Sequence, residues 1–199
     1  MGSSTILDII ASTVLAGFVL LMIINLDETL ANSTYTTTND FDVQTNMTTL
    51  VEMIEKDFRR IGYCANPSNF PDPSIAMREA TASSIKFLSD VNNDGNIDSV
   101  RYYVGDTSSA RFTPNKYDVM LYRQVDLQTP QAFSLGVVTF NFLYYNALMD
   151  TLTFPITNPA QVNSIQLSIL LESRYAYDTV YSYSYWRQLR LAARNLRNR

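Results

Sequence analysis

The stretch DVNNDGNIDSVRYY, from residue 90 to residue 103, carries an oxygen-bearing side chain at every second position of its first half. Calcium takes about six to eight oxygen ligands, and a loop that curls around the ion supplies them from alternate side chains. Gly95 stands at the sixth place, where calcium-binding loops make their sharpest turn. The sequence therefore predicts a calcium site. Its ligands would be Asp90, Asn92, Asp94, Asn96 and Asp98.

The rest of this loop departs from the calcium-sensor pattern. Its twelfth place holds Arg101, where a bidentate glutamate would complete the coordination. The flanking residues alternate as strands do, so no helix-opening switch is expected. The prediction is a weakly bound structural Ca²⁺ that clamps a hairpin. An ordinary turn is the alternative, because Asn-Asp-Gly-Asn between alternating runs is itself a turn signal.

Composition excludes several other chemistries. The 199 residues include no histidine and one cysteine, Cys64. The lack of histidine rules out Ser/His/Asp triads, Cys/His pairs and histidine metal sites, so we expect no enzyme. The net charge is −4, which argues against nucleic acid as a partner. Residues 186–199 carry five arginines and no acid, as either a basic anion-binding tail or a final element with solvated arginines.

The N-terminal segment is apolar enough for a membrane. Ile9 to Leu26 contains no charged residue and is 18 residues long, near the lower limit for crossing a bilayer. No Lys or Arg precedes Lys56, and no cleavage site is evident, so we expect the segment to be retained. Asp8 lies at its start, where a carboxylate either needs a partner or caps the helix.

No proline or glycine interrupts the chain between Phe18 and Ile61. The later part, TTLVEMIEKDFRRIGY, has apolar residues at spacings of three and four, as on one face of a helix. We therefore predict one long helix from about residue 5 to about residue 61. Its hydrophobic membrane or filament-core part is 1–30, its amphipathic second half is 31–63, and a β-rich domain follows at 64–199.

Short β-branched and aromatic runs with period-two alternation fill the rest of the chain. They predict an antiparallel sheet of about five to seven strands. Tyr181, Tyr183 and Tyr185 share one strand face, where tyrosines more often pack in the core than bind carbohydrate or another subunit. Asn32 and Asn46 stand in sequon-like tripeptides, which predicts glycosylation where a host supplies it.

Three stretches in this order resemble type IV pilins and pseudopilins, and PilW-like minor pilins most closely. EKDFRRIGY, residues 55–63, is similar to the end of the long helix in those proteins. SSIKFLSDVNNDGNIDSVRYYV, residues 83–104, is similar to the strand, acidic loop and strand that follow it. YWRQLRLAARNLRNR, residues 185–199, is similar to their arginine-rich end. The resemblance implies an α+β fold in which the long helix packs on the antiparallel sheet.

STILD, residues 4–8, is similar in pattern to the start of mature pilins, with Asp8 where the family has a glutamate. In the family that glutamate pairs with the N-terminal amine of the next subunit. Two alignments remain open: either Ser3 precedes the cut in place of the usual glycine, or Met1 is the processed end and Asp8 lies three places late. The assembly residues implied by the resemblance are Asp8, Ile9, Ile10, Val14, Leu15, Phe18 and Leu21.

The resemblance implies a structural subunit of an extracellular filament, with copies of itself or other pilins as partners. The subunit would reside in the inner, cytoplasmic membrane before assembly and on the cell surface afterwards. The alternative is a membrane-anchored surface adhesion module with a calcium-stabilised β-domain. Observation of ordered filaments would favour the filament-subunit hypothesis.

Overall fold

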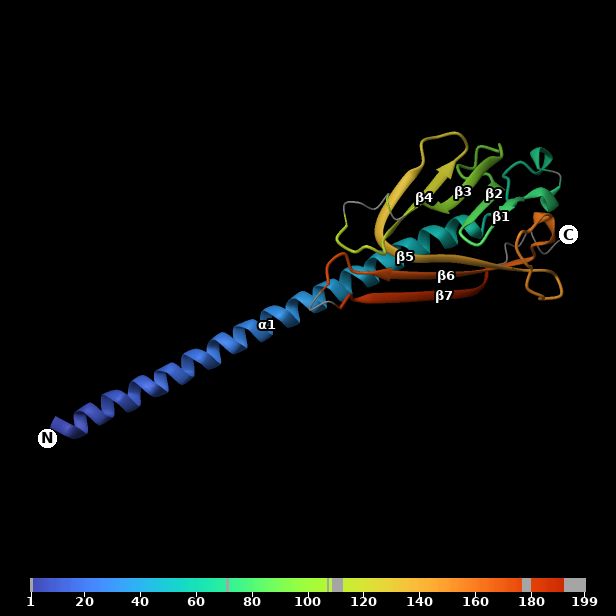
Figure 1. Cartoon of the computed structure of the whole chain (residues 1–199). Coiled ribbons are helices and arrows are strands. Elements are labelled where there is room, and N and C mark those ends of the chain that lie inside the picture. Colours follow the sequence, from blue (N-terminus) through green and yellow to red (C-terminus); the bar gives the residue numbers. More distant parts are fainter. Residues whose placement is uncertain (1, 71, 107, 109–112, 177–179, 192–199) are drawn as a thin grey trace. The chain divides into compact units, whose positions relative to one another are not determined.

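The computed structural model describes residues 2–70, 72–106, 108, 113–176 and 180–191. In these residues a long helix, α1 (Gly2–Phe58), precedes a seven-stranded antiparallel sheet (Figure 1). This is the α+β, pilin-like layout predicted from the sequence. The strands are β1 (Met77–Ala80), β2 (Ser84–Ser89), β3 (Asp98–Val104), β4 (Val119–Val125), β5 (Gln131–Tyr145), β6 (Ser164–Glu172) and β7 (Tyr183–Leu191).

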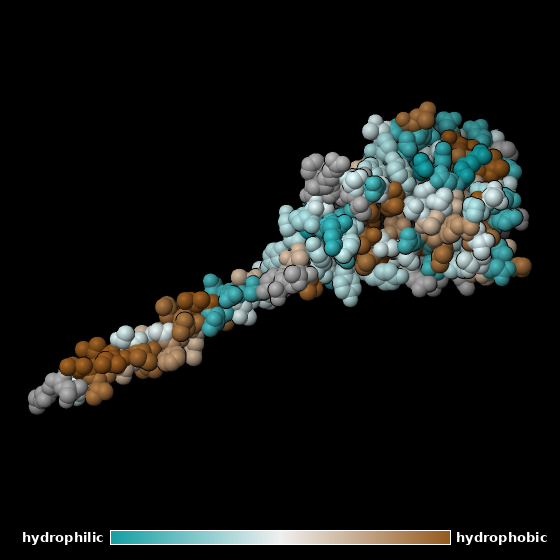
Figure 2. Space-filling model, viewed as in Figure 1, coloured by the Kyte–Doolittle hydropathy of each residue, from teal (hydrophilic) through white to brown (hydrophobic). Residues whose placement is uncertain are grey.

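The chain divides into two units, residues 1–39 and residues 40–199. The first unit consists of the N-terminal part of α1, and its large apolar side chains from Ile6 to Leu30 are exposed within it. Figure 2 shows apolar side chains gathered over this part of the helix. By length and composition, α1 is able to cross a membrane, with a mean hydropathy of 2.5 over its most apolar 18-residue window.

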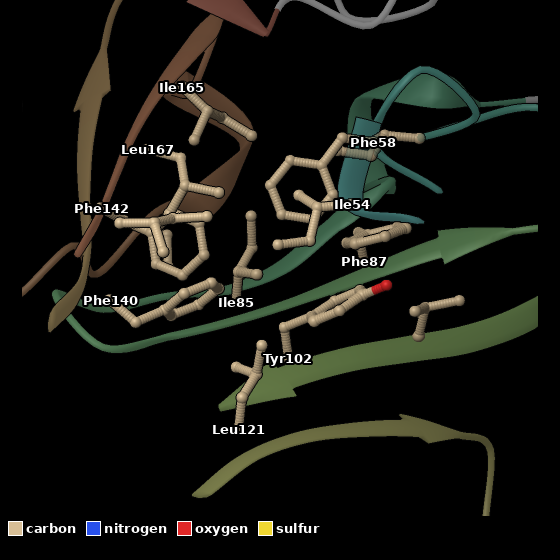
Figure 3. Packing of buried hydrophobic residues seen from close by; sticks show 14 of the residues in the cluster. Ile54, Phe58, Ile85, Phe87, Tyr102, Leu121, Phe140, Phe142, Ile165 and Leu167 are labelled. Atoms are coloured by element: carbon tan, nitrogen blue, oxygen red, sulfur yellow. The ribbon is translucent and has the colours of Figure 1, made fainter. Parts of the chain in front are cut away.

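In the second unit, one stripe of α1 is buried. The stripe consists of Val43, Met47, Leu50, Ile54 and Phe58, at spacings of three and four residues. These side chains join inward-facing residues of the sheet in one core cluster (Figure 3). The ring of Phe58 contacts Phe87 and Tyr102 edge-on, at centroid distances of 5.5 and 5.7 Å. The last turn of the helix therefore packs at the centre of the core.

The seven strands follow one another in sheet order, and every neighbouring pair is antiparallel. The first half of β5 pairs with β4 and its second half pairs with β6, so the sheet changes direction within β5 (Figure 1). Gly136 lies at this change with φ of +77°, and a Cβ there would lie 2.1 Å from the Glu172 carbonyl oxygen. Only glycine fits this position without displacing β6.

A buried ion pair ties the end of α1 to the sheet. Asp57 Oδ2 accepts a hydrogen bond from Arg123 Nε at 2.6 Å and another from the Tyr102 hydroxyl at 2.7 Å. Both charged side chains are mostly buried, Asp57 at 7% and Arg123 at 15% exposed. Burial lowers the pKa of Arg123, but the hydrogen bond and charge of Asp57 outweigh it and raise that pKa. Arg123 therefore stays charged, and the ion pair holds Asp57 of α1 in one position on the sheet.

The structure differs from the sequence predictions in three places. The helix ends at Phe58 rather than near Ile61, because Gly62 adopts a φ of +73° and its amide donates to the Leu88 carbonyl oxygen at 2.8 Å. Strand β1 was not predicted, since it is only four residues long and its buried and exposed positions do not alternate cleanly. Tyr183 and Tyr185 do not pack in the core: they are 73% and 56% exposed.

The strand predicted around Tyr181 runs as β7, and Trp186 on its other face packs against the core. The arginine-rich run falls partly outside the described residues. Arg194, Arg197 and Arg199 lie there, so the structure leaves both interpretations of the basic tail as predictions.

Removing the buried carboxylate should destabilise the fold strongly. Asp57→Ala leaves the charge of Arg123 buried and unpaired, so the free energy of unfolding should fall by about 3–5 kcal/mol. Glu55→Ala is the matched control: it breaks the pair of Glu55 with Arg59, whose side chain is 71% exposed, and should cost less than about 1 kcal/mol. Urea denaturation of the full chain in detergent, followed by Trp186 fluorescence, measures both. Equal losses for the two variants would contradict the assignment.

Candidate functional site

The predicted calcium loop connects β2 to β3, and the carboxylate of its first residue, Asp90, accepts hydrogen bonds from backbone amides. Asp90 is fully buried. Its Oδ2 accepts from the amides of Ala65 and Gly95, each at 3.0 Å, and its Oδ1 accepts from the amide of Asp94 at 3.2 Å. An aspartate that gathers nearby amides in this way stabilises a tight turn. Gly95 has a φ of +84°, the left-handed conformation that favours glycine.

The same loop anchors the segment that leaves α1. Arg60 donates to the Val91 carbonyl oxygen at 2.8 Å and to the Asn93 side chain. The Asp90 amide donates to the Tyr63 carbonyl oxygen at 2.8 Å. Asn69 Nδ2 and the Cys64 thiol both donate to the Gly95 carbonyl oxygen, at 2.6 and 3.4 Å. The loop therefore holds residues 60–69 against the β2–β3 connection.

The remaining predicted ligands are partly brought together. Asn92, Asp94 and Asn96 are exposed; Asn92 Nδ2 donates to Asp94 Oδ2, and Asp94 Oδ1 accepts from the Asn96 amide. Asp98 faces back across the neck of the loop, where its carboxylate accepts from the Val91 amide at 2.8 Å. Among the described residues, no three His, Cys, Asp or Glu side chains are placed to hold one metal ion. Calcium binding stays a prediction of the sequence.

The pKa values of Asp90 and Asp98, at the two ends of the loop, are shifted in opposite directions. Burial would raise the pKa of Asp90, but hydrogen bonds from the amides of Ala65, Gly95, Asn93 and Asp94 lower it below its usual value. Burial raises the pKa of Asp98, and the like charges of Asp126 and Asp94 raise it further, against the hydrogen bond from Val91. Asp90 is thus held as a carboxylate, whereas a nearby cation would stabilise the charged form of Asp98 and lower its pKa.

The second set of predicted residues lies on the N-terminal part of α1. Ile9, Ile10, Val14, Leu15, Phe18 and Leu21 are all more than half exposed in the first unit. They point in several directions around the helix, so a partner or lipid would have to surround it. Asp8 is exposed, and the small side chains of Ser12, Thr13 and Ala16 leave a shallow hollow beside it. The hydroxyls of Ser12 and Thr13 donate to the carbonyl oxygens of Asp8 and Ile9.

The sequon asparagines also lie on α1, where Asn32 and Asn46 are half-buried. Thr36 donates to the Asn32 carbonyl oxygen at 3.1 Å, and Thr48 donates in the same way to Gln44. Glycosylation of either asparagine stays a prediction.

Comparison with protein families identifies the group to which this architecture belongs. A family model described as prepilin peptidase-dependent protein B matches residues 36–191, which is most of the chain. The chain belongs to the prepilin peptidase-dependent protein B family. The match covers the amphipathic part of α1, the acidic loop and the whole sheet, and it begins after the apolar segment. No curated protein and no solved structure matches the chain.

Membership places the protein among those associated with type IV pilus-like systems that depend on a prepilin peptidase. The fold and the exposed apolar helix agree with that association. Two features of this family member could not be read from its sequence pattern. The sequence did not reveal the role of Asp90, because aspartates that bind calcium and aspartates that accept hydrogen bonds from backbone amides occur in the same pattern. The Asp57–Arg123 pair was not predicted because its two residues are far apart in the chain.

Replacing the buried loop carboxylate should weaken the fold at neutral pH. In Asp90→Asn an NH₂ group replaces one of two accepting oxygens, so at least one backbone amide loses its acceptor. Because the folded pKa of Asp90 is lowered, its stabilisation is complete above the unfolded pKa of about 4 and is lost as the pH falls through the folded pKa.

The difference in melting temperature between wild type and Asp90→Asn should therefore be constant from neutral pH down to about pH 5 and shrink below about pH 4. Thermal melts of the full chain across this range measure it, with the exposed Glu52→Gln as the control that should change little. A difference that grows on acidification would overturn the assigned role.

Calcium should raise the melting temperature if the exposed carboxylates bind it. At millimolar concentrations, Ca²⁺ should stabilise the wild type, and Asp94→Asn combined with Asp98→Asn should abolish the increase. Magnesium at the same concentration serves as the control, because it demands tighter octahedral geometry. Identical melts with calcium and with chelator would remove the predicted clamp.

Proposed function

We propose that this protein is a structural subunit of a type IV pilus-like extracellular filament, of the PilW-like minor class or a major one. The subunit is held in the inner membrane by the N-terminal part of α1 until assembly. In the filament the same helix packs against copies of itself or other pilins. We propose no catalytic activity, since the sequence has no histidine to activate a nucleophile.

One observation carries this proposal: the first unit exposes apolar side chains around the whole helix. In water such a surface would associate non-specifically, because apolar area of this extent is stable only in lipid or in contact with other apolar surfaces. From residue 40 onward, the same helix has a single buried stripe, and its exposed positions are polar except for Phe41. This division supports a helix that joins a soluble domain to a hydrophobic assembly. The family match supports a pilus-like setting for it.

Asp8 is the charged residue at the start of the apolar segment, and we propose that it pairs with the N-terminal amine of a neighbouring subunit. A carboxylate in an apolar bundle is costly unless a cation neutralises it. The hollow formed by Ser12, Thr13 and Ala16 supports close approach of another helix at this level. The pair would set the axial position of each subunit as it is added.

A second candidate is a membrane-anchored surface adhesion module. The exposure of Tyr183 and Tyr185 on β7 favours it, because tyrosines present a flat apolar face and a hydroxyl to a ligand. The two candidates differ in assembly: an adhesion module functions as separate subunits in the membrane. Adhesion by a filament subunit would combine them.

Loss of the Asp8 carboxylate should reduce assembly without unfolding the domain. For Asp8→Ala we expect the yield of surface filaments to fall by about tenfold or more, as loss of an interaction of about 1.4 kcal/mol or more per subunit predicts. Asp27→Ala, which removes the next acid along α1, is the matched control and should have little effect. Filaments sheared from cells and counted by electron microscopy give the yield, and the melting temperature of the domain checks folding. A normal filament yield from Asp8→Ala would end the proposed pairing.

A further inference from the structure

A groove runs along the outer side of β1, at the edge of the sheet. Strand β1 pairs with β2 on one side, and on the other side no strand of the described residues pairs with it. The connection between β5 and β6 forms the opposite wall. Between them lies a hollow of about 550 Å³, here named the β1 groove. Its principal lining residues are Arg78, Glu79, Ala80, Phe154, Pro155 and Ile156.

The β1 groove combines an apolar wall with one free positive charge. Phe154 is 41% exposed, and its ring is held edge-on against Tyr144 at a centroid distance of 6.0 Å. Glu79 is neutralised by Arg101 at 3.3 Å and also accepts from the Ser84 hydroxyl. Arg78 is exposed and forms no ion pair within the described part of the chain. A ligand with an apolar group beside a carboxylate would complement the groove.

The edge of β1 is poorly suited to accept another strand. The strand has only four residues, and its register with β2 shifts between Met77 and Glu79. Short, bulged and charged edges are the devices by which sheets avoid pairing with other strands. The occupant is therefore a side chain that enters from outside, and not an extended peptide.

The surface of the same unit carries a side chain with matching chemistry. Phe41 is 67% exposed on α1 and is flanked in sequence by Asp40 and Asp42, both exposed. Val43 and Met47 on another face of the helix are buried in the core, so the position of Phe41 on the domain is fixed. An aromatic ring between two carboxylates fits a groove with an aromatic wall and a free arginine.

We propose that Phe41 of one copy inserts into the β1 groove of a second copy, with Asp40 or Asp42 pairing with Arg78. The two surfaces differ, so the contact is heterologous and leaves a free groove on one copy and a free Phe41 on the other. Such contacts repeat from subunit to subunit and build helical arrays. The inference rests on the proposed filament, and it assigns the domain-to-domain contact that accompanies packing of the N-terminal helices.

Cysteine cross-linking tests the contact in the full chain, in a Cys64→Ser background assembled in cells. Copies with Gln44→Cys, an exposed position one turn along α1 from Phe41, and copies with Ile156→Cys carry tags of different size, so that Phe41 itself is kept. A short bis-maleimide joins thiols that lie close together. Leu127→Cys is the control for Gln44→Cys, since Leu127 is also exposed but lies on the loop between β4 and β5. We expect about tenfold more mixed dimer from Gln44→Cys than from Leu127→Cys, and adding Phe41→Ala to the Gln44→Cys copy should remove that excess.

Charge reversal provides a second readout. Arg78→Asp on the groove should reduce the cross-link, and Asp40→Arg with Asp42→Arg on the Phe41-bearing copy should restore it. Restoration supports the pairing, because the reversed charges attract only if they meet across the contact. A cross-link from Gln44→Cys no stronger than the Leu127→Cys control, or no restoration by the reversed charges, overturns the inference.

A parallel reaction separates this inference from the proposed function. Leu15→Cys copies should cross-link to one another if the N-terminal helices pack together. Cross-linking at Leu15 without cross-linking between Gln44→Cys and Ile156→Cys leaves the filament proposal standing and rejects the groove contact. Absence of both rejects both proposals.

Discussion

The carboxylate of Asp57 connects the last turn of α1 to β3 and β4 through Tyr102 and Arg123, and the arrangement of the domain depends on this connection. It fixes the rotation of the helix, so that Phe58 points into the aromatic core. Just beyond it the chain turns away at Gly62 and bonds to the acidic loop, which ends the helix. A buried ion pair contributes little net stability compared with apolar residues of the same shape, but breaking one is costly. It therefore specifies one position for the helix on the sheet.

That fixed position gives the two parts of α1 separate tasks. From residue 40 onward, one stripe of α1 packs on the sheet, and the exposed positions are polar except for Phe41. Before residue 40, apolar side chains are exposed around the helix, and nothing in that unit covers them. A hydrophobic surface without an internal partner needs an external one, and lipid or neighbouring helices can supply it. We propose that both do so in turn, before and after assembly.

Local patterns in the sequence predicted the long helix, its apolar stripe and most strands of the antiparallel sheet, because each depends on residue spacing within one element. The acidic alternation from Asp90 to Asp98 correctly marked a turn between strands. Whether its aspartates bind calcium or accept hydrogen bonds from backbone amides was less predictable, since both kinds of loop have the same spacing. Strand β1 is too short to carry a pattern. Two further features depend on how distant parts of the chain pack together, so a short stretch of sequence does not reveal them. They are the Asp57–Arg123 pair and the exposure of Tyr183 and Tyr185.

The central claim is that the N-terminal part of α1 lies at the core of a filament. Electron cryomicroscopy of filaments sheared from cells, at a resolution that traces the chain, tests it most directly. The account predicts a central bundle in which residues 9–26 of adjacent subunits pack together, with the sheets on the outside. Detection of the protein only as separate subunits, with these residues embedded in lipid or detergent, would contradict it.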